Sequence, residues 1–112
     1  MTTIKKLIDV LELTVFNFTE DAKIDSFYIG DLLSWVMGKA DTHNCWLTVM
    51  NNINVCAVAS LTESSCVILC EGVQPDESLK QKAIQQNLCL LGCRLPLFEA
   101  AKSITENILN AC

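Results

Sequence analysis

The chain has 112 residues, of which 51% are hydrophobic and 19% are charged, and this balance excludes an intrinsically disordered segment. Thirteen acidic residues against eight basic ones give a net charge of −5, so a surface that binds nucleic-acid phosphates is not expected. Acidic residues are spread over both halves of the chain, and no linker segment rich in Pro, Gly or Ser divides it. We therefore expect one domain over residues 1–112.

The first helix and two short strands are expected in the N-terminal third. Apolar residues recur at spacings of three and four over residues 4–11, behind Thr3 as a cap, and this period predicts a helix. Residues 14–18 are rich in β-branched and aromatic side chains and predict a strand, and residues 24–28 predict a weaker one.

A second helix is expected after Gly30. Asp31 is a good N-cap for a helix over residues 32–37, and Gly38 is placed to end it.

Strands and helices then alternate to the end of the chain. Strands are predicted over residues 45–49, 65–70 and 88–92, the second of them nearly all apolar and so expected in a central position. A helix is predicted over residues 53–61, with Asn51 or Asn52 as its cap. A second is predicted to start at Pro75-Asp76-Glu77 and to end at about Gln86, and a third to start at Pro96. The alternation predicts an α/β fold, a three-layer α/β/α arrangement with a mostly parallel sheet of four to five strands.

Seven cysteines are many for this length, and their odd number excludes a complete set of intrachain disulfides. Asp9 and Glu12 interrupt the N-terminal apolar residues, so no secretory signal is expected. No apolar run approaches the roughly 20 residues of a membrane span. We expect a cytoplasmic protein with reduced thiols and no membrane contact.

Catalytic and metal-binding patterns are absent from the sequence. The one histidine, His43, lies in a polar loop, and neither glycine-rich phosphate motif occurs. Cys66/Cys70 and Cys89/Cys93 have three residues between them, and on a strand such residues share a face but lie about 13 Å apart. Ligation would need neighbouring strands to cooperate, so buried structural thiols are expected, with no metal, no cofactor and no catalytic residue.

A ligand site is predicted at the carboxyl ends of the strands. In open α/β sheets ligands bind at this edge, where helix N-termini offer free N–H groups. The loops that follow the three strands there contribute Asn51, Asn52, Glu71, Gly72, Cys93 and Arg94. A small, phosphorylated ligand is one interpretation of this set. The alternative is that the asparagines cap helices, Gly72 makes a turn and Arg94 is a surface charge.

Four segments resemble the family of DRTGG-domain proteins. They are residues 30–38 (GDLLSWVMG), 45–49 (CWLTV), 52–59 (NINVCAVA) and 97–101 (LFEAA). The resemblance extends over about residues 3–105 and is closest to the small stand-alone proteins found beside iron-only hydrogenase genes. It implies a fold similar to the N-terminal domain of HPr kinase, and a regulatory or dimerisation module rather than a catalyst.

The chain departs from the motif that gives this family its name. Met50-Asn51-Asn52 replaces Gly-Asp-Arg, Cys70-Glu71-Gly72 replaces Thr-Gly-Gly, and Cys93 replaces a threonine after the last strand. An arginine is lost and a carboxylate gained, which disfavours an anionic ligand.

Three hypotheses follow. The first is a non-catalytic regulatory or assembly module that forms a homodimer and serves a redox or metabolic enzyme system, with hydrogenase or electron-transfer subunits as partners. A mean hydropathy of +0.34 supports it, since so apolar a small chain is expected to expose a patch that a partner covers. The second is a sensor for a nucleotide or metabolite at the strand ends. The third is redox or metal chemistry by the cysteines.

Overall fold

The computed structural model describes residues 2–110. Five strands form the main sheet in the order β2-β7-β6-β5-β4, and two more form a small separate ladder, β1-β3. The bounds are β1 Thr2–Thr3, β2 Thr14–Asn17, β3 Lys23–Ile24, β4 Ser26–Ile29, β5 Asn44–Thr48, β6 Cys66–Leu69 and β7 Leu90–Gly92. Strands β4, β5, β6 and β7 are parallel, whereas β2 pairs with β7 in the antiparallel direction.

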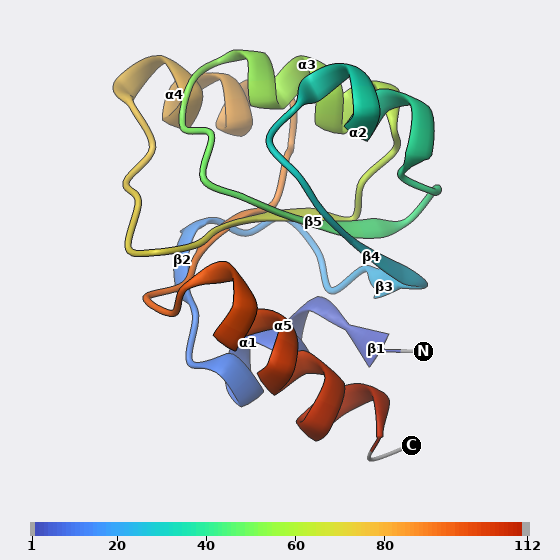
Figure 1. Cartoon of the computed structure of the whole chain (residues 1–112). Helices are drawn as coiled ribbons and strands as arrows, with labels where there is room; N and C mark the ends of the chain where they lie inside the picture. Colours follow the sequence, from blue (N-terminus) through green and yellow to red (C-terminus); the bar gives the residue numbers. More distant parts are fainter. Residues whose placement is uncertain (1, 111–112) are drawn as a thin grey trace.

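Helices cover both faces of this sheet, as Figure 1 shows. They are α1 Ile4–Leu11, α2 Leu33–Lys39, α3 Asn54–Leu61, α4 Glu77–Gln85 and α5 Leu97–Ile104, the last continued by a π-helical turn, η1 Thr105–Leu109. Helices α2, α3 and α4 lie on one face, and α1 and α5 lie on the other. The predicted three-layer α/β fold with a mostly parallel sheet is confirmed.

Strand β6 shows why its sequence is apolar throughout. It is the middle strand of the sheet, and its side chains alternate between two separate cores. Ile68 belongs to the core under α1 and α5, while Val67 and Leu69 belong to the core under α2, α3 and α4. Both layers therefore depend on one short strand.

The N-terminal helix forms as its period predicts. Thr3 caps α1 by accepting a hydrogen bond from the Lys6 N–H, and Ile4, Leu7 and Leu11 are buried. The ladder between β1 and β3, which the sequence analysis did not predict, pairs Thr2 with Ile24 and so joins the start of this helix to the segment before β4.

Several boundaries differ from the prediction. Strand β7 begins at Leu90, two residues later than predicted, and the N-cap of α3 is Ile53 rather than Asn51 or Asn52. Asp31 does not cap α2, whose N-cap is Leu32, because the Asp31 side chain bonds to the end of β5 instead. Gly38 lies inside α2, which continues to Lys39. The predicted strand over residues 24–28 is divided at Asp25 into β3 and β4.

No helix among residues 2–110 is long and apolar enough to cross a membrane.

Candidate functional site

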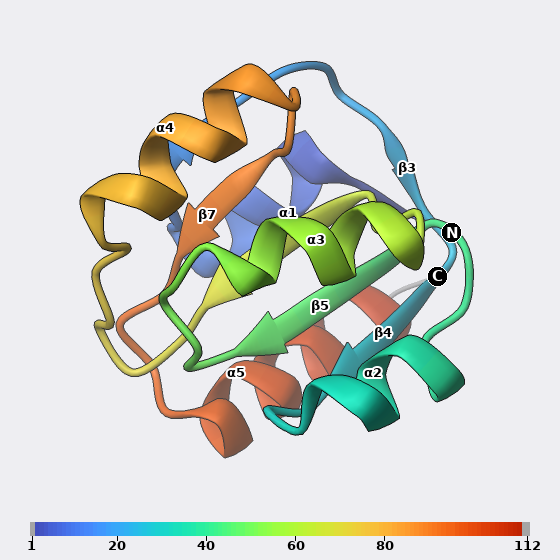
Figure 2. The same cartoon turned by 90° about the horizontal axis from the view of Figure 1, so that it is seen from above.

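The carboxyl ends of the four parallel strands lie at one edge of the sheet, which we call the carboxyl edge. In Figure 2 the visible arrowheads of β4, β5 and β7 point the same way. Four loops leave this edge and lead into α2, α3, α4 and α5. All six residues predicted as ligand-binding lie in three of these loops.

Hydrogen bonds join the three loops into one continuous rim. The Asn51 side chain donates to the Gln74 carbonyl at 3.1 Å, which connects the loop after β5 to the loop after β6. The Glu71 N–H donates to the Leu95 carbonyl at 2.9 Å, and the Gly72 N–H donates to the Cys93 carbonyl at 3.0 Å. The predicted residues are therefore brought together along the rim.

Two of the helix starts at the rim are closed by side chains of the chain itself. The side-chain oxygen of Asn52 accepts from the Asn54 N–H at 3.0 Å, and Asp76 caps α4 by accepting from the Leu79 N–H at 2.8 Å. The N-cap of α3 is Ile53 and not Asn51 or Asn52, but the Asn52 side chain does bind the first N–H of this helix. These contacts occupy N–H groups that an anion would need.

Helix α5, like α2 and α3, has an N-cap residue whose side chain makes no capping hydrogen bond, but α5 alone starts beside Arg94. Its N-cap is Pro96, and exposed Arg94 lies two residues before it. This end of the rim combines the positive end of a helix with the only arginine of the chain.

Glu71 and Gly72 make a turn with left-handed backbone at both positions, φ 61° and 70°. Glycine adopts this conformation without strain, whereas Glu71 is held in it by its backbone bond to Leu95. The turn brings the loop after β6 against the loop after β7.

Asp31 belongs to the rim, although the sequence analysis gave it a different role. Its carboxylate accepts a hydrogen bond from the buried Thr48 hydroxyl at 2.5 Å and another from the Val49 N–H at 2.9 Å. The carboxylate holds the loop before α2 to the end of β5, an interaction that nothing in the local sequence pattern indicates.

Cys70 and Cys93 lie side by side on neighbouring strands where β6 and β7 end. The Cys93 N–H donates to the Leu69 carbonyl at 2.8 Å, beside the register pair Leu69–Gly92, so the two cysteines are neighbours across the strands. The neighbouring Cys70 thiol lowers the pKa of Cys93 to about 6, with further help from the Leu95 N–H and the Arg94 charge against the opposing effect of burial. The proximity of Cys93, together with burial, raises the pKa of Cys70 well above its ordinary range.

The other thiols on this face of the sheet are shielded. Cys45 on β5 is the register partner of Cys66 on β6, and the Cys89 carbonyl bonds to the residue after Cys66. Burial is the largest cause that raises the pKa of Cys45, and it raises the pKa of Cys89 to about 12. Between residues 2 and 110, no group of three or more His, Cys, Asp or Glu side chains could hold a metal ion.

Large apolar side chains are exposed along the carboxyl edge, a feature that the sequence analysis did not place. They come from the end of β4, the loop after β7 and the starts of α2, α3 and α5: Ile29, Leu32, Ile53, Leu95 and Phe98. Phe98 is the most exposed, at 74%. The available signal was that Phe98 falls outside the buried period of α5, which is formed by Ala100 and Ile104.

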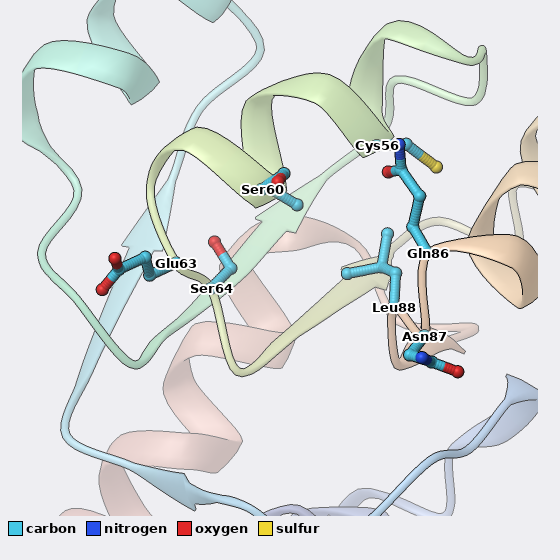
Figure 3. Close-up of a pocket in the computed structure, with 8 residues that line it drawn as sticks. Cys56, Ser60, Glu63, Ser64, Gln86, Asn87 and Leu88 are labelled. Atoms are coloured by element: carbon cyan, nitrogen blue, oxygen red, sulfur yellow. The ribbon is translucent and has the colours of Figure 1, made fainter.

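A pocket of ≈140 Å³ lies at the opposite, amino edge of the sheet (Figure 3). It is formed by α3, the turn after α3 and the turn after α4. Its polar groups come from Ser60, Glu63, Ser64, Gln86 and Asn87, and its apolar groups from Cys56, Ala59 and Leu88. None of the six predicted residues lines it.

The one histidine, His43, lies at the same amino edge and is exposed. Its Nδ1 lies 3.5 Å from a carboxylate oxygen of Asp25. No nucleophile is paired with it in these contacts.

A solved structure is similar to this chain over most of its length. No protein-family model matches the chain, and no curated protein matches it significantly. The crystal structure of the CBS and DRTGG domains of the regulatory region of Clostridium perfringens pyrophosphatase, complexed with the activator diadenosine tetraphosphate, superposes with a TM-score of 0.73 at 14% identity. The match covers 92% of this chain and 46% of that one, so this chain spans about half the length of that structure. The comparison supports a DRTGG-like fold.

Proposed function

We propose that this protein is a non-catalytic regulatory or assembly module that forms a homodimer through the carboxyl edge of its sheet. The exposed apolar side chains along that edge carry the proposal. Several exposed apolar side chains at one edge of a small acidic protein are typical of a surface covered by a partner. A second copy is the simplest partner, because a two-fold axis covers the same surface on both chains at once.

The charges at the edge are compatible with such a contact. The Asp31 carboxylate already accepts two hydrogen bonds from its own chain, so it needs less from solvent. Arg94 and Glu71 are both exposed and lie in adjacent loops, so each chain offers both signs of charge to the other.

Sedimentation velocity of the full chain at micromolar concentrations tests the proposal. We expect a dimer for the native sequence and for Ile84→Asp, a control at a 60% exposed apolar residue near the end of α4, away from the carboxyl edge. Phe98→Asp is expected to give a monomer of 12 kDa. A monomeric native protein, or dissociation caused by Ile84→Asp and not by Phe98→Asp, would contradict the proposal.

A small-ligand sensor is the second candidate, and the activator bound to the similar regulatory region favours it. In this chain the start of α5 beside Arg94 is the part of the rim best suited to a phosphorylated ligand, because no side chain caps that helix.

Thermal-shift measurements with adenine nucleotides test the second candidate. A ligand at ten times its Kd is expected to raise the melting temperature by about 5 °C. The rise should be lost in Arg94→Gln and kept in Lys102→Gln, a control on the last turn of α5. Indifference to every nucleotide, or equal loss in both variants, would count against a site at the rim.

The enzyme system that the module serves is proposed from the family resemblance. Hydrogenase or electron-transfer subunits are the expected partners. Pull-down under anaerobic conditions tests this, with Phe98→Asp and Ile84→Asp as paired baits. If no bait recovers a redox enzyme, this part of the proposal is contradicted. Self-association is tested separately by sedimentation.

A further inference from the structure

Cys70 and Cys93 differ from the other paired thiols of the sheet. Cys45 and Cys66 are also partners across neighbouring strands, but both are fully buried in the core under α1 and α5, where β5 and β6 begin. Cys93 retains 4% exposure and is followed directly by the exposed Arg94, at the edge where the strand opens into a loop.

The surroundings of Cys93 favour a thiolate. The Cys70 thiol, the Leu95 N–H and the Arg94 guanidinium each lower the pKa of Cys93. A thiolate, not a thiol, is the nucleophile in thiol oxidation. Cys70 is the neighbour of Cys93 across the two strands, one residue beyond the register pair Leu69–Gly92, and a second thiol must lie this close to resolve an oxidised first one.

We propose that Cys70 and Cys93 form an oxidation site at the carboxyl edge, at which a hydroperoxide converts the two thiols into one intrachain disulfide. The test of this inference is separate from the test of the proposed self-association.

The reaction balances in two steps. The Cys93 sulfur attacks one peroxide oxygen and the O–O bond breaks, giving a sulfenic acid on Cys93 and, after proton transfer, one water. Cys70 then loses its proton and attacks the Cys93 sulfur, so that an S–S bond forms and the sulfenic oxygen leaves as a second water. Two thiols and one peroxide give one disulfide and two waters. The bond joins the loop after β6 to the loop after β7.

The experiment uses the full chain with Cys112→Ser, so that the C-terminal thiol takes no part and six cysteines remain. Reduced protein is treated with hydrogen peroxide without other oxidants, denatured in N-ethylmaleimide and digested with trypsin. Lysine and arginine positions place Cys70 on peptide 40–80 and Cys93 on peptide 83–94. We expect the loss of two of six reactive thiols and a link between these peptides, with fragment ions assigning it to Cys70 and Cys93.

Variants separate the site from general oxidation. Cys93→Ser should abolish the link, and Cys70→Ser should leave a sulfenic acid on Cys93 that dimedone labels. Cys45→Ser removes the shielded pair and should leave the link intact. Loss of thiols without a disulfide between peptides 40–80 and 83–94 would overturn the proposal, and so would a disulfide that involves Cys66 or Cys89. The parent protein alone gives this result if a variant fails to fold.

Discussion

At the residue scale, Asp31 shows how one side chain joins two elements that are separated in sequence. Its carboxylate accepts from Thr48 and Val49 and so holds the loop before α2 to the end of β5. Thr48 is fully buried, and a buried hydroxyl that loses its acceptor carries the cost of its desolvation.

Replacement of Asp31 should therefore lower stability. We expect Asp31→Ala to reduce the free energy of unfolding by about 2 kcal/mol, a magnitude typical of hydrogen bonds to a charged group. Asp41→Ala, at an exposed loop position before β5, is the matched control and should change it by less than about 0.5 kcal/mol. Denaturant titration measures both, and equal effects would show that the Asp31 bonds contribute nothing specific.

The same residue shows a limit of prediction from sequence. Aspartate before a helical period is a reasonable N-cap, and Asp76 does cap α4 in this way. The Asp31 carboxylate instead forms tertiary hydrogen bonds with the end of β5. The sequence around residue 31 does not show that residue 48 lies nearby in the fold.

At the element scale, two glycines have opposite roles. Gly38 lies inside α2 with open space where a Cβ would stand. At Gly92 on β7, a Cβ would lie 2.7 Å from Cε2 of Phe16, which packs against the core under α2, α3 and α4.

Alanine at these two positions should act in opposite directions. Gly38→Ala should raise the free energy of unfolding by about 0.5–1 kcal/mol, because glycine inside a helix loses more backbone entropy on folding. Gly92→Ala should lower it by about 1–3 kcal/mol, because the ring of Phe16 must move from its packed position. Thermal unfolding of the pair checks this, and stabilisation by Gly92→Ala would mean that β2 and β7 do not approach as closely as described.

Elements with a regular apolar period were predictable. The buried residues of α1 and the all-apolar run of β6 both follow from spacing and composition. The β1-β3 ladder was not, because two residues per strand are too few to show a period. The antiparallel direction of β2 was not either, since strand direction is decided by long-range pairing.

At the scale of the whole molecule, topology gathers the loops after β5, β6 and β7 at one edge. That gathering was predictable from the parallel order of the strands. Gly72 does make a turn, as the simpler interpretation holds, whereas the N-cap of α3 is Ile53 and not an asparagine. The hydrogen bonds of Asn51 and Gly72 join the loops into one rim. The exposed apolar side chains beside them were not predictable, because an apolar residue outside the buried period of its helix looks the same whether solvent or a partner covers it.

Self-association through this edge is the central claim, and hydrogen–deuterium exchange at two protein concentrations tests it most directly. Backbone amides in the loops at residues 30–35, 49–54 and 93–98 should exchange more slowly at high concentration than at low concentration. Amides around the pocket at residues 60–64 and 86–88 should exchange at the same rate at both. Exchange independent of concentration at the carboxyl edge, or protection confined to the amino edge, would contradict the account.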